Sequence, residues 1–146
     1  MAEILYREES YNLVGACFEV YKNKGSGFTE QVYQECLNIE LNMRGISFFA
    51  QPILELEYKG TILKQTFRPD FICYDKIVIE IKALERLADV HRAQALNYLN
   101  ATKFDLALLV NFGHFPKLEY ERIANDRNRS ASTLYSRMAE RDDFNF

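Results

Sequence analysis

Three charged residues, Asp70, Glu80 and Lys82, have the types and the spacing that could build a catalytic site. Residues 77–82 read Ile-Val-Ile-Glu-Ile-Lys, which is typical of a β-strand, and successive side chains on a strand point to opposite faces. Glu80 and Lys82 therefore share a face. A brief turn connects this strand to a shorter one at residues 70–73. Pairing of the two strands would bring Asp70 beside Glu80 and gather two carboxylates and an ammonium group.

Such a cluster points to metal-assisted hydrolysis. Two neighbouring carboxylates repel each other unless a cation lies between them. Mg²⁺ prefers carboxylate oxygens and keeps several of its waters. Lys82 could orient or help deprotonate one of these waters, while the metal stabilises charge on a phosphate under attack. The simpler interpretation is a solvated strand face with a Glu80–Lys82 ion pair, because an acid-x-Lys pattern often recurs by chance.

The surrounding elements predict an α/β sandwich with a mixed sheet. Two helices come first, followed by an antiparallel meander, a crossover helix and a buried strand. Lys59-Gly60 is typical of a tight hairpin turn, and Asp89 is a plausible cap for the third helix. Helices are expected at residues 9–22, 29–44 and 89–102, and strands at 53–58, 61–67, 70–73, 77–82, 104–111 and 117–123.

Apolar residues at helical spacing predict which helix faces are buried. The expected buried faces are Tyr11, Val14, Cys17, Phe18 and Tyr21 in the first helix, and Val32, Cys36, Ile39 and Met43 in the second.

No Cys-x-x-Cys pair exists, and the three cysteines are far apart, so reduced thiols are expected rather than a zinc site.

The length of 146 residues suits one domain, here expected to span residues 1–124. Residues 125–146 form a more polar tail, although Ala131, Leu134, Tyr135 and Met138 fit one helical face, so this tail is expected either to pack on the domain or to contact a partner or a second copy.

No signal peptide or membrane-spanning run is evident, so a cytoplasmic protein is expected. The net charge of −3 counts against a general nucleic-acid binder, which is usually basic.

Several motifs resemble those of a known nuclease group. Pro69-Asp70, nine intervening residues and then Glu80-Ile81-Lys82 resemble the signature of the PD-(D/E)xK nuclease superfamily. Residues 27–33 match Gly-x-x-Glu-x-x-Tyr, the motif of the GxxExxY proteins within that superfamily. Residues 91–99 and 104–113 are similar to the later helix and the last core strand of the same family. The resemblance covers residues 6–123 and implies a restriction-endonuclease-like sandwich with the core order α-β-β-β-α-β.

The resemblance also implies roles for individual residues. Asp70 and Glu80 match the principal metal ligands, Glu30 matches a helical carboxylate that helps to hold the metal, and Lys82 matches the lysine that positions the attacking water. The backbone carbonyl of Ile81 matches an additional ligand. The implied metal is Mg²⁺ or Mn²⁺.

Four further residues are expected to support the site. Gln94 and Tyr98 resemble a Gln-x-x-x-Tyr element that lies beside the metal in related exonuclease-like proteins, and His91 lies one turn earlier on the same side of the helix. Tyr33 shares a helix face with Glu30 and is expected either in the core or bracing that carboxylate. Taken alone, Glu30 is better explained as an acid that favours the first turn of a helix.

The sequence as a whole therefore predicts a metal-dependent phosphodiesterase that acts on nucleic acid, with DNA favoured over RNA. The main alternative is a nuclease-fold module that binds or regulates without cutting, which the acidic balance and the small size support. A third alternative, an oligomerising domain, depends on the tail and on the many aromatic residues.

Overall fold

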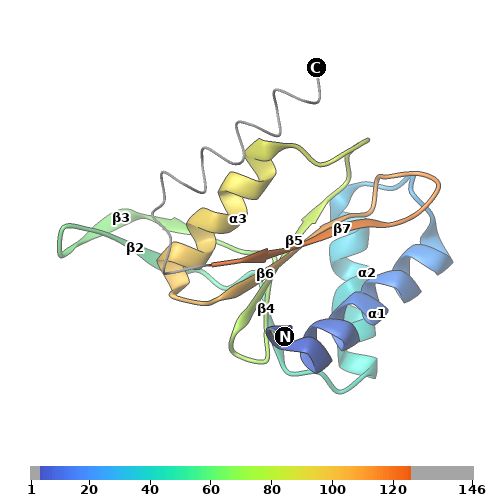
Figure 1. Ribbon diagram of the computed structural model, residues 1–146, viewed down its shortest axis with the longest axis horizontal. Helices are drawn as coiled ribbons and strands as arrows, with labels where there is room; N and C mark the ends of the chain where they lie inside the picture. Colours follow the sequence, from blue (N-terminus) through green and yellow to red (C-terminus); the bar gives the residue numbers. More distant parts are fainter. Residues whose placement is uncertain (1–3, 126–146) are drawn as a thin grey trace.

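The protein is described by a computed structural model that places residues 4–125 (Figure 1). The C-terminal tail, expected at residues 125–146 with a helical face, lies outside the described residues from residue 126 onward. Among residues 4–125, no helix is both long and apolar enough to span a bilayer. In chain order the elements are α1 (Arg7–Lys24), α2 (Glu30–Met43), β1 (Phe48–Ala50), β2 (Leu54–Tyr58), β3 (Thr61–Phe67), β4 (Phe71–Cys73), β5 (Ile77–Lys82), α3 (Asp89–Thr102), β6 (Leu106–Asn111) and β7 (Glu119–Ala124).

The central sheet has five strands in the order β1-β4-β5-β6-β7. β5 and β6 run parallel, and the other neighbouring pairs run antiparallel. A parallel pair needs a long crossover connection, which α3 supplies here. The predicted α/β fold with a mixed sheet is therefore confirmed, and α3, β3 and β5 have the predicted bounds.

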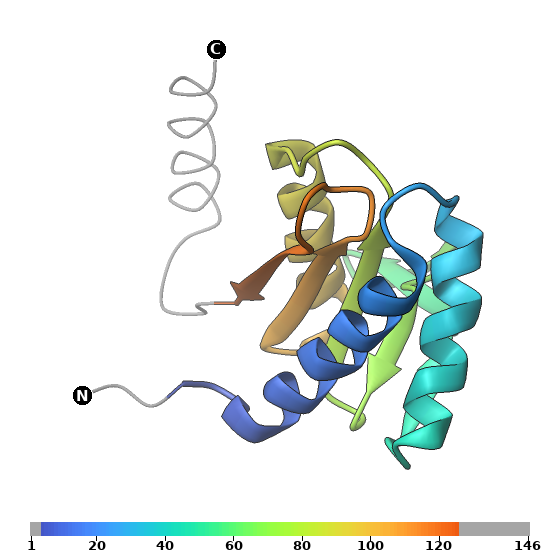
Figure 2. The same ribbon diagram turned by 90° about the vertical axis from the view of Figure 1, so that its right-hand side faces the viewer.

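Helices cover both faces of the sheet: α1 and α2 pack on one face and α3 on the other (Figure 2). The alternation along β5 decides which side chains meet which helices. Ile77, Ile79 and Ile81 belong to the core beneath α1 and α2, whereas Val78 packs against α3. Glu80 and Lys82 alternate with the isoleucines in the same way as Val78, so both lie on the sheet face that α3 covers.

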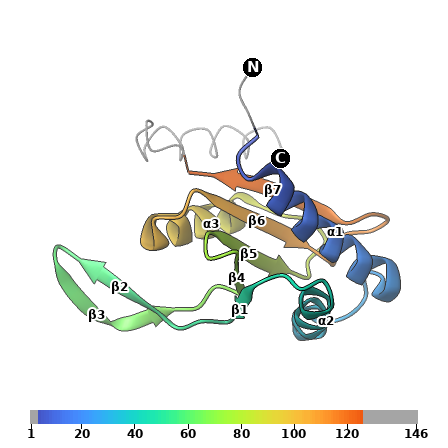
Figure 3. The same cartoon turned by 90° about the horizontal axis from the view of Figure 1, so that it is seen from below.

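The predicted meander is wrong in one respect. β2 and β3 form a separate two-stranded sheet that projects away from the central sheet (Figure 3), and β4 pairs instead with β1. β1 has only three residues, too few to show an alternating pattern in the sequence. The hairpin turn itself is as predicted, because Lys59 and Gly60 both have left-handed φ angles of 51° and 82°.

The predicted buried faces of α1 and α2 are only partly right: Cys17 is buried, and Val14, Tyr21 and Cys36 pack at the edge of the core. Tyr11 and Met43 are 78% and 77% exposed, and Phe18 and Ile39 also face outward. Each helix carries two overlapping apolar stripes, and periodicity cannot choose between stripes that lie about one residue apart. Packing against the sheet selects Leu13, Ala16, Cys17 and Val20 in α1, and Tyr33, Leu37 and Leu41 in α2.

Candidate active site

Asp70 and Glu80 lie side by side on neighbouring strands. The β4–β5 register pairs Phe71 with Ile79, which places Asp70 next to Glu80 just before β4 begins. The Asp70 amide donates a hydrogen bond to Glu80 Oε1 at 3.0 Å, and the Ile81 amide donates one to Asp70 Oδ2 at 2.7 Å. Each carboxylate therefore uses one oxygen to fix its orientation. This juxtaposition agrees with the strand-pairing argument from the sequence.

Burial and mutual repulsion make these two carboxyl groups reluctant to ionise. The side chain of Glu80 is almost completely buried, at 4% exposure. Desolvation, together with the nearby charge on Asp70, raises the pKa of Glu80 to about 8. Desolvation also raises the pKa of Asp70, although the Ile81 amide and Lys82 partly offset it. In the absence of a cation, the pair therefore retains a proton at a pH where an exposed carboxyl would have lost it.

Lys82 is held by a chain of side-chain hydrogen bonds from α3. Its Nζ donates to Gln94 Oε1 at 2.8 Å, and Gln94 Nε2 donates to the Tyr98 hydroxyl at 3.3 Å. The Tyr98 hydroxyl has a raised pKa because it is partly desolvated and because Glu80 and Asp70 lie nearby. Gln94 and Tyr98 thus lie beside Lys82, and their role in a reaction stays a prediction.

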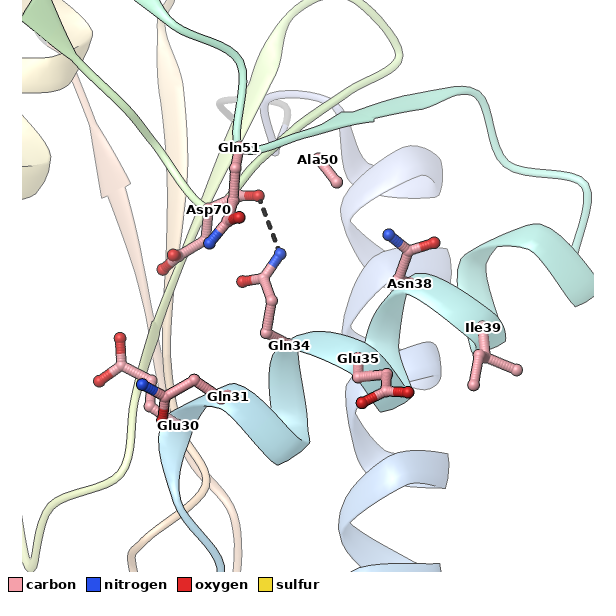
Figure 4. A pocket seen from close by; sticks show the side chains of 9 residues that line it. All are labelled: Glu30, Gln31, Gln34, Glu35, Asn38, Ile39, Ala50, Gln51 and Asp70. Carbon is pink, nitrogen blue, oxygen red and sulfur yellow. Dashed lines mark hydrogen bonds between the residues drawn. The ribbon is translucent and has the colours of Figure 1, made fainter.

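Glu30 approaches the site from the first turn of α2. Its side chain is largely exposed, but partial desolvation and the charge on Asp70 raise its pKa, and Lys82 opposes this shift. Figure 4 shows Glu30 and Asp70 at one end of a shared groove. Within residues 4–125, however, no three His, Cys, Asp or Glu side chains lie close enough together to hold a metal ion. Glu30 therefore faces the pair without completing a three-carboxylate set.

Tyr33 and His91 have structural contacts instead of contacts with the carboxylates. Tyr33 is fully buried, and its ring stacks on Phe112 with centroids 4.7 Å apart. Its hydroxyl donates to the Gly25 carbonyl, which ties down the loop before α2. His91 Nδ1 accepts a hydrogen bond from the Ala88 amide at 2.9 Å.

The predicted cap of α3 is wrong by one residue. Ala88 takes the capping position, and Asp89 is the first helical residue. The Asp89 carboxylate accepts a hydrogen bond from Arg92 at 2.8 Å, and the same guanidinium donates twice to Glu121 on β7. This arrangement fixes the start of α3 against the sheet.

Sequence reasoning missed Asn111, which fixes the loop that follows Lys82. Asn111 is fully buried at the end of β6. Its Oδ1 accepts from the amides of Leu84 and Gly113, and its Nδ2 donates to the Leu84 carbonyl and to Glu119. A polar residue that ends a buried apolar run is the signal that could have identified it.

We expect Asn111→Ala to destabilise the protein by about 2–4 kcal/mol. The substitution would leave three partly buried backbone groups, on Leu84 and Gly113, without this partner, and each loss of a buried partner typically costs ~1–3 kcal/mol. Urea unfolding of the wild type and the variant would measure the change. Asn12→Ala, at an exposed site on α1, serves as the control. A loss below about 0.5 kcal/mol would show that water replaces the amide and that the network is unimportant for stability.

The donor set fits a hard divalent cation. Mg²⁺ is commonly held by only one or two carboxylates, with waters and substrate phosphate oxygens completing its octahedron. Asp70 and Glu80 supply two such carboxylates in direct interaction, and a cation would relieve the repulsion that raises the pKa of Glu80. Two carboxylates therefore suffice for this ion, and Glu30 is near enough to influence it electrostatically.

Comparisons with solved structures agree with this fold. The crystal structure of SSO0001 superimposes with a TM-score of 0.56 at 21% identity, over 92% of this chain and 65% of that chain. An alkaline exonuclease from Laribacter hongkongensis superimposes with a TM-score of 0.51 at 12% identity, over 96% of this chain and 77% of that one. The protein thus spans somewhat less than two thirds of SSO0001, and at these identities the likeness concerns the fold.

Comparisons of sequence identify the family. No curated protein matches the chain significantly. The family model described as the PD-(D/E)XK nuclease superfamily matches residues 7–123, most of the chain and all of the elements that build the site. The chain therefore belongs to the PD-(D/E)XK nuclease superfamily.

Proposed function

We propose that this protein is a Mg²⁺- or Mn²⁺-dependent nuclease that hydrolyses phosphodiester bonds in nucleic acid. The observation that carries the proposal is the pairing of the buried Glu80 with the half-buried Asp70, joined by the bond from the Asp70 amide to the Glu80 carboxylate, beside a lysine that Gln94 holds in place. Burying carboxyl groups in this way is energetically unfavourable, and carboxyl groups with strongly perturbed pKa values cluster at functional sites. The finer assignment to the GxxExxY group rests on Gly27, Glu30 and Tyr33, and we propose it together with a single domain over residues 1–124.

Each residue has a separate task in this proposal. Asp70 and Glu80 would hold the cation, with the Ile81 carbonyl and Glu30 as additional oxygen donors. The bound cation would neutralise charge on the phosphate under attack. Lys82 would hold the attacking water, since Gln94 Oε1 already orients its ammonium group. Gln94 and Tyr98 would keep Lys82 on the substrate side of the pair.

The alternative is a nuclease-fold module that binds nucleic acid or a protein partner without cutting it. The position of Glu30 favours this alternative, since no third carboxylate closes on the pair in residues 4–125. The net charge of −3 also limits the surface available to grip a duplex.

The two functions differ in a cleavage assay on labelled single- and double-stranded DNA and RNA. The nuclease proposal expects cleavage that requires Mg²⁺ or Mn²⁺ and stops when EDTA is added. Tight binding without cleavage on every substrate would favour the binding module. Absence of both binding and cleavage would contradict both functions for these substrates.

We expect Gln94→Ala to lower the cleavage rate by about 10–100-fold with little change in melting temperature. Loss of a group that orients an active-site residue typically costs this much. Gln94→Glu keeps an oxygen acceptor for Lys82 and should retain more activity. Cleavage rates and thermal melts of both variants would check this. A stability loss of ~1–3 kcal/mol in Gln94→Ala would show instead that the amide serves the core.

A further inference from the structure

A groove lined by seven polar residues, together with Ile39 and Ala50, begins at Asp70 and runs along α2 towards β1 (Figure 4). Its volume is about 660 Å³, within the range of about 300–1,000 Å³ that small-molecule sites occupy. Gln31, Gln34 and Asn38 follow one another on one face of α2, because their spacing of three and four residues matches the helical repeat. Gln51 faces them from the end of β1.

The side chains that line the groove are unsuited to binding the phosphate backbone of a nucleic acid. None of the described residues that line it is Lys or Arg, whereas Glu30, Glu35 and Asp70 all contribute carboxyl groups. Away from the proposed metal, Glu35 would repel a phosphate backbone, and no lining Lys or Arg would attract one. Amide side chains, by contrast, pair with base edges, and carboxylates accept hydrogen bonds from the amino groups of bases.

We propose that this groove binds unpaired bases of a nucleic-acid strand next to the phosphate at the Asp70–Glu80 pair. The inference rests on the proposed function and extends it to the class of substrate. Bases that are paired in a duplex have already engaged their Watson–Crick edges, so the groove selects single-stranded segments. DNA and RNA present the same edges here, and the test below separates them.

The groove is joined to the candidate catalytic residues by direct hydrogen bonds. The carbonyl of Asp70 accepts one bond from Gln34 Nε2 at 3.3 Å and another from the Gln51 amide at 2.9 Å. Gln51 has a left-handed φ of 50°, which is uncommon for a residue other than glycine. The backbone of Asp70 is therefore held by both walls of the groove, so a base bound there lies directly beside the metal-binding carboxylates.

The excess of acceptors in the groove predicts a base preference. Adenine and cytosine carry exocyclic amino groups that can donate to Gln, Asn and Glu oxygens, and thymine and uracil carry none. The groove should therefore favour cytosine over thymine, two pyrimidines of similar size. One well-formed pairing of this kind discriminates by at least about fivefold.

The test measures binding of labelled oligodeoxycytidine and oligothymidine of equal length by fluorescence anisotropy. The full chain carries Lys82→Ala, so that the strands stay intact, and Mg²⁺ is present. Oligocytidine and oligouridine form the RNA arm. A groove variant adds Gln31→Ala and Asn38→Ala. A control variant instead adds Asn12→Ala and Asn23→Ala, which remove two exposed amides from α1. Alanine suits helices, so both variants should fold.

We expect the cytosine strand to bind at least about fivefold more tightly than the thymine strand. The groove variant should bring this ratio close to one, and the control variant should keep it. Equal binding of both strands, binding of neither, or a ratio that survives in the groove variant would overturn the inference. Cleavage by the wild type reports on the proposed function separately. Cleavage without base preference would overturn only the base-binding inference. Base preference without cleavage would overturn only the proposed nuclease activity.

Discussion

Replacing Lys82 by alanine should abolish most cleavage while metal binding persists. In the proposed site Lys82 acts on water, and Asp70 and Glu80 hold the cation, so the two functions should separate in the variant. Loss of a group that assists proton transfer typically costs ~10²–10⁴-fold in rate. Removal of a neighbouring positive charge should leave metal affinity unchanged or raise it. Single-turnover cleavage and titration calorimetry would measure the two effects.

Lys22→Ala, at an exposed position on α1, is the matched control and should cleave like the wild type. If the wild type and Lys82→Ala show the same trace cleavage, that activity is contamination and the enzyme proposal fails on these substrates. Loss of metal binding in Lys82→Ala would show that the lysine maintains the site structurally.

Asp70→Ala should lose both metal binding and cleavage. Changes outside the ligand shell typically cost 10–100-fold in affinity, so the loss of a direct ligand should cost at least about 100-fold. Calorimetry with Mn²⁺ would measure this loss, and Asp75→Ala, an exposed acid in the β4–β5 turn, is the control. Equal Mn²⁺ affinity in Asp70→Ala and the wild type would rule out this site.

The pH dependence of the same titration follows from the pKa of Glu80. Without a cation this carboxyl keeps its proton up to about pH 8, and a metal ion must displace it. Affinity should therefore rise as the pH increases towards 8, by up to about tenfold per unit for one released proton, and level off above that value. Glu80→Gln has no proton to release and should bind weakly without this rise. An affinity that is independent of pH below 8 in the wild type would contradict a protonated pair.

The sequence determined the arrangement of β5 and its neighbour because local rules suffice there. The alternation of Ile77–Lys82 places Glu80 and Lys82 on one face, and the short turn from β4 leaves Asp70 little choice of partner. The bounds of α3 also followed from its pattern. By contrast, the contact of Gln94 with Lys82 depends on how α3 lies across the sheet; the family resemblance indicated only that Gln94 lies beside the site.

Other features depend on tertiary packing that no local pattern reveals. The centre of the buried face was misplaced in α1 and α2, leaving Tyr11 and Met43 exposed, because the apolar residues of each helix span more than one face. The β2–β3 hairpin leaves the central sheet because β1, three residues long, occupies the edge beside β4. Asn111 and Gln34 become important only when β6 and α2 bring them to the Leu84 loop and to Asp70.

A crystal structure of the wild type grown with Mn²⁺ tests the central claim most directly, since anomalous scattering identifies the ion. We predict a Mn²⁺ peak in coordination contact with both Asp70 and Glu80, with Lys82 still bonded to Gln94 and Glu30 turned towards the ion directly or through a water. A fully ordered Asp70–Glu80 pair without a peak, at Mn²⁺ concentrations that saturate calorimetric binding, would contradict the proposed metal site and the nuclease built on it.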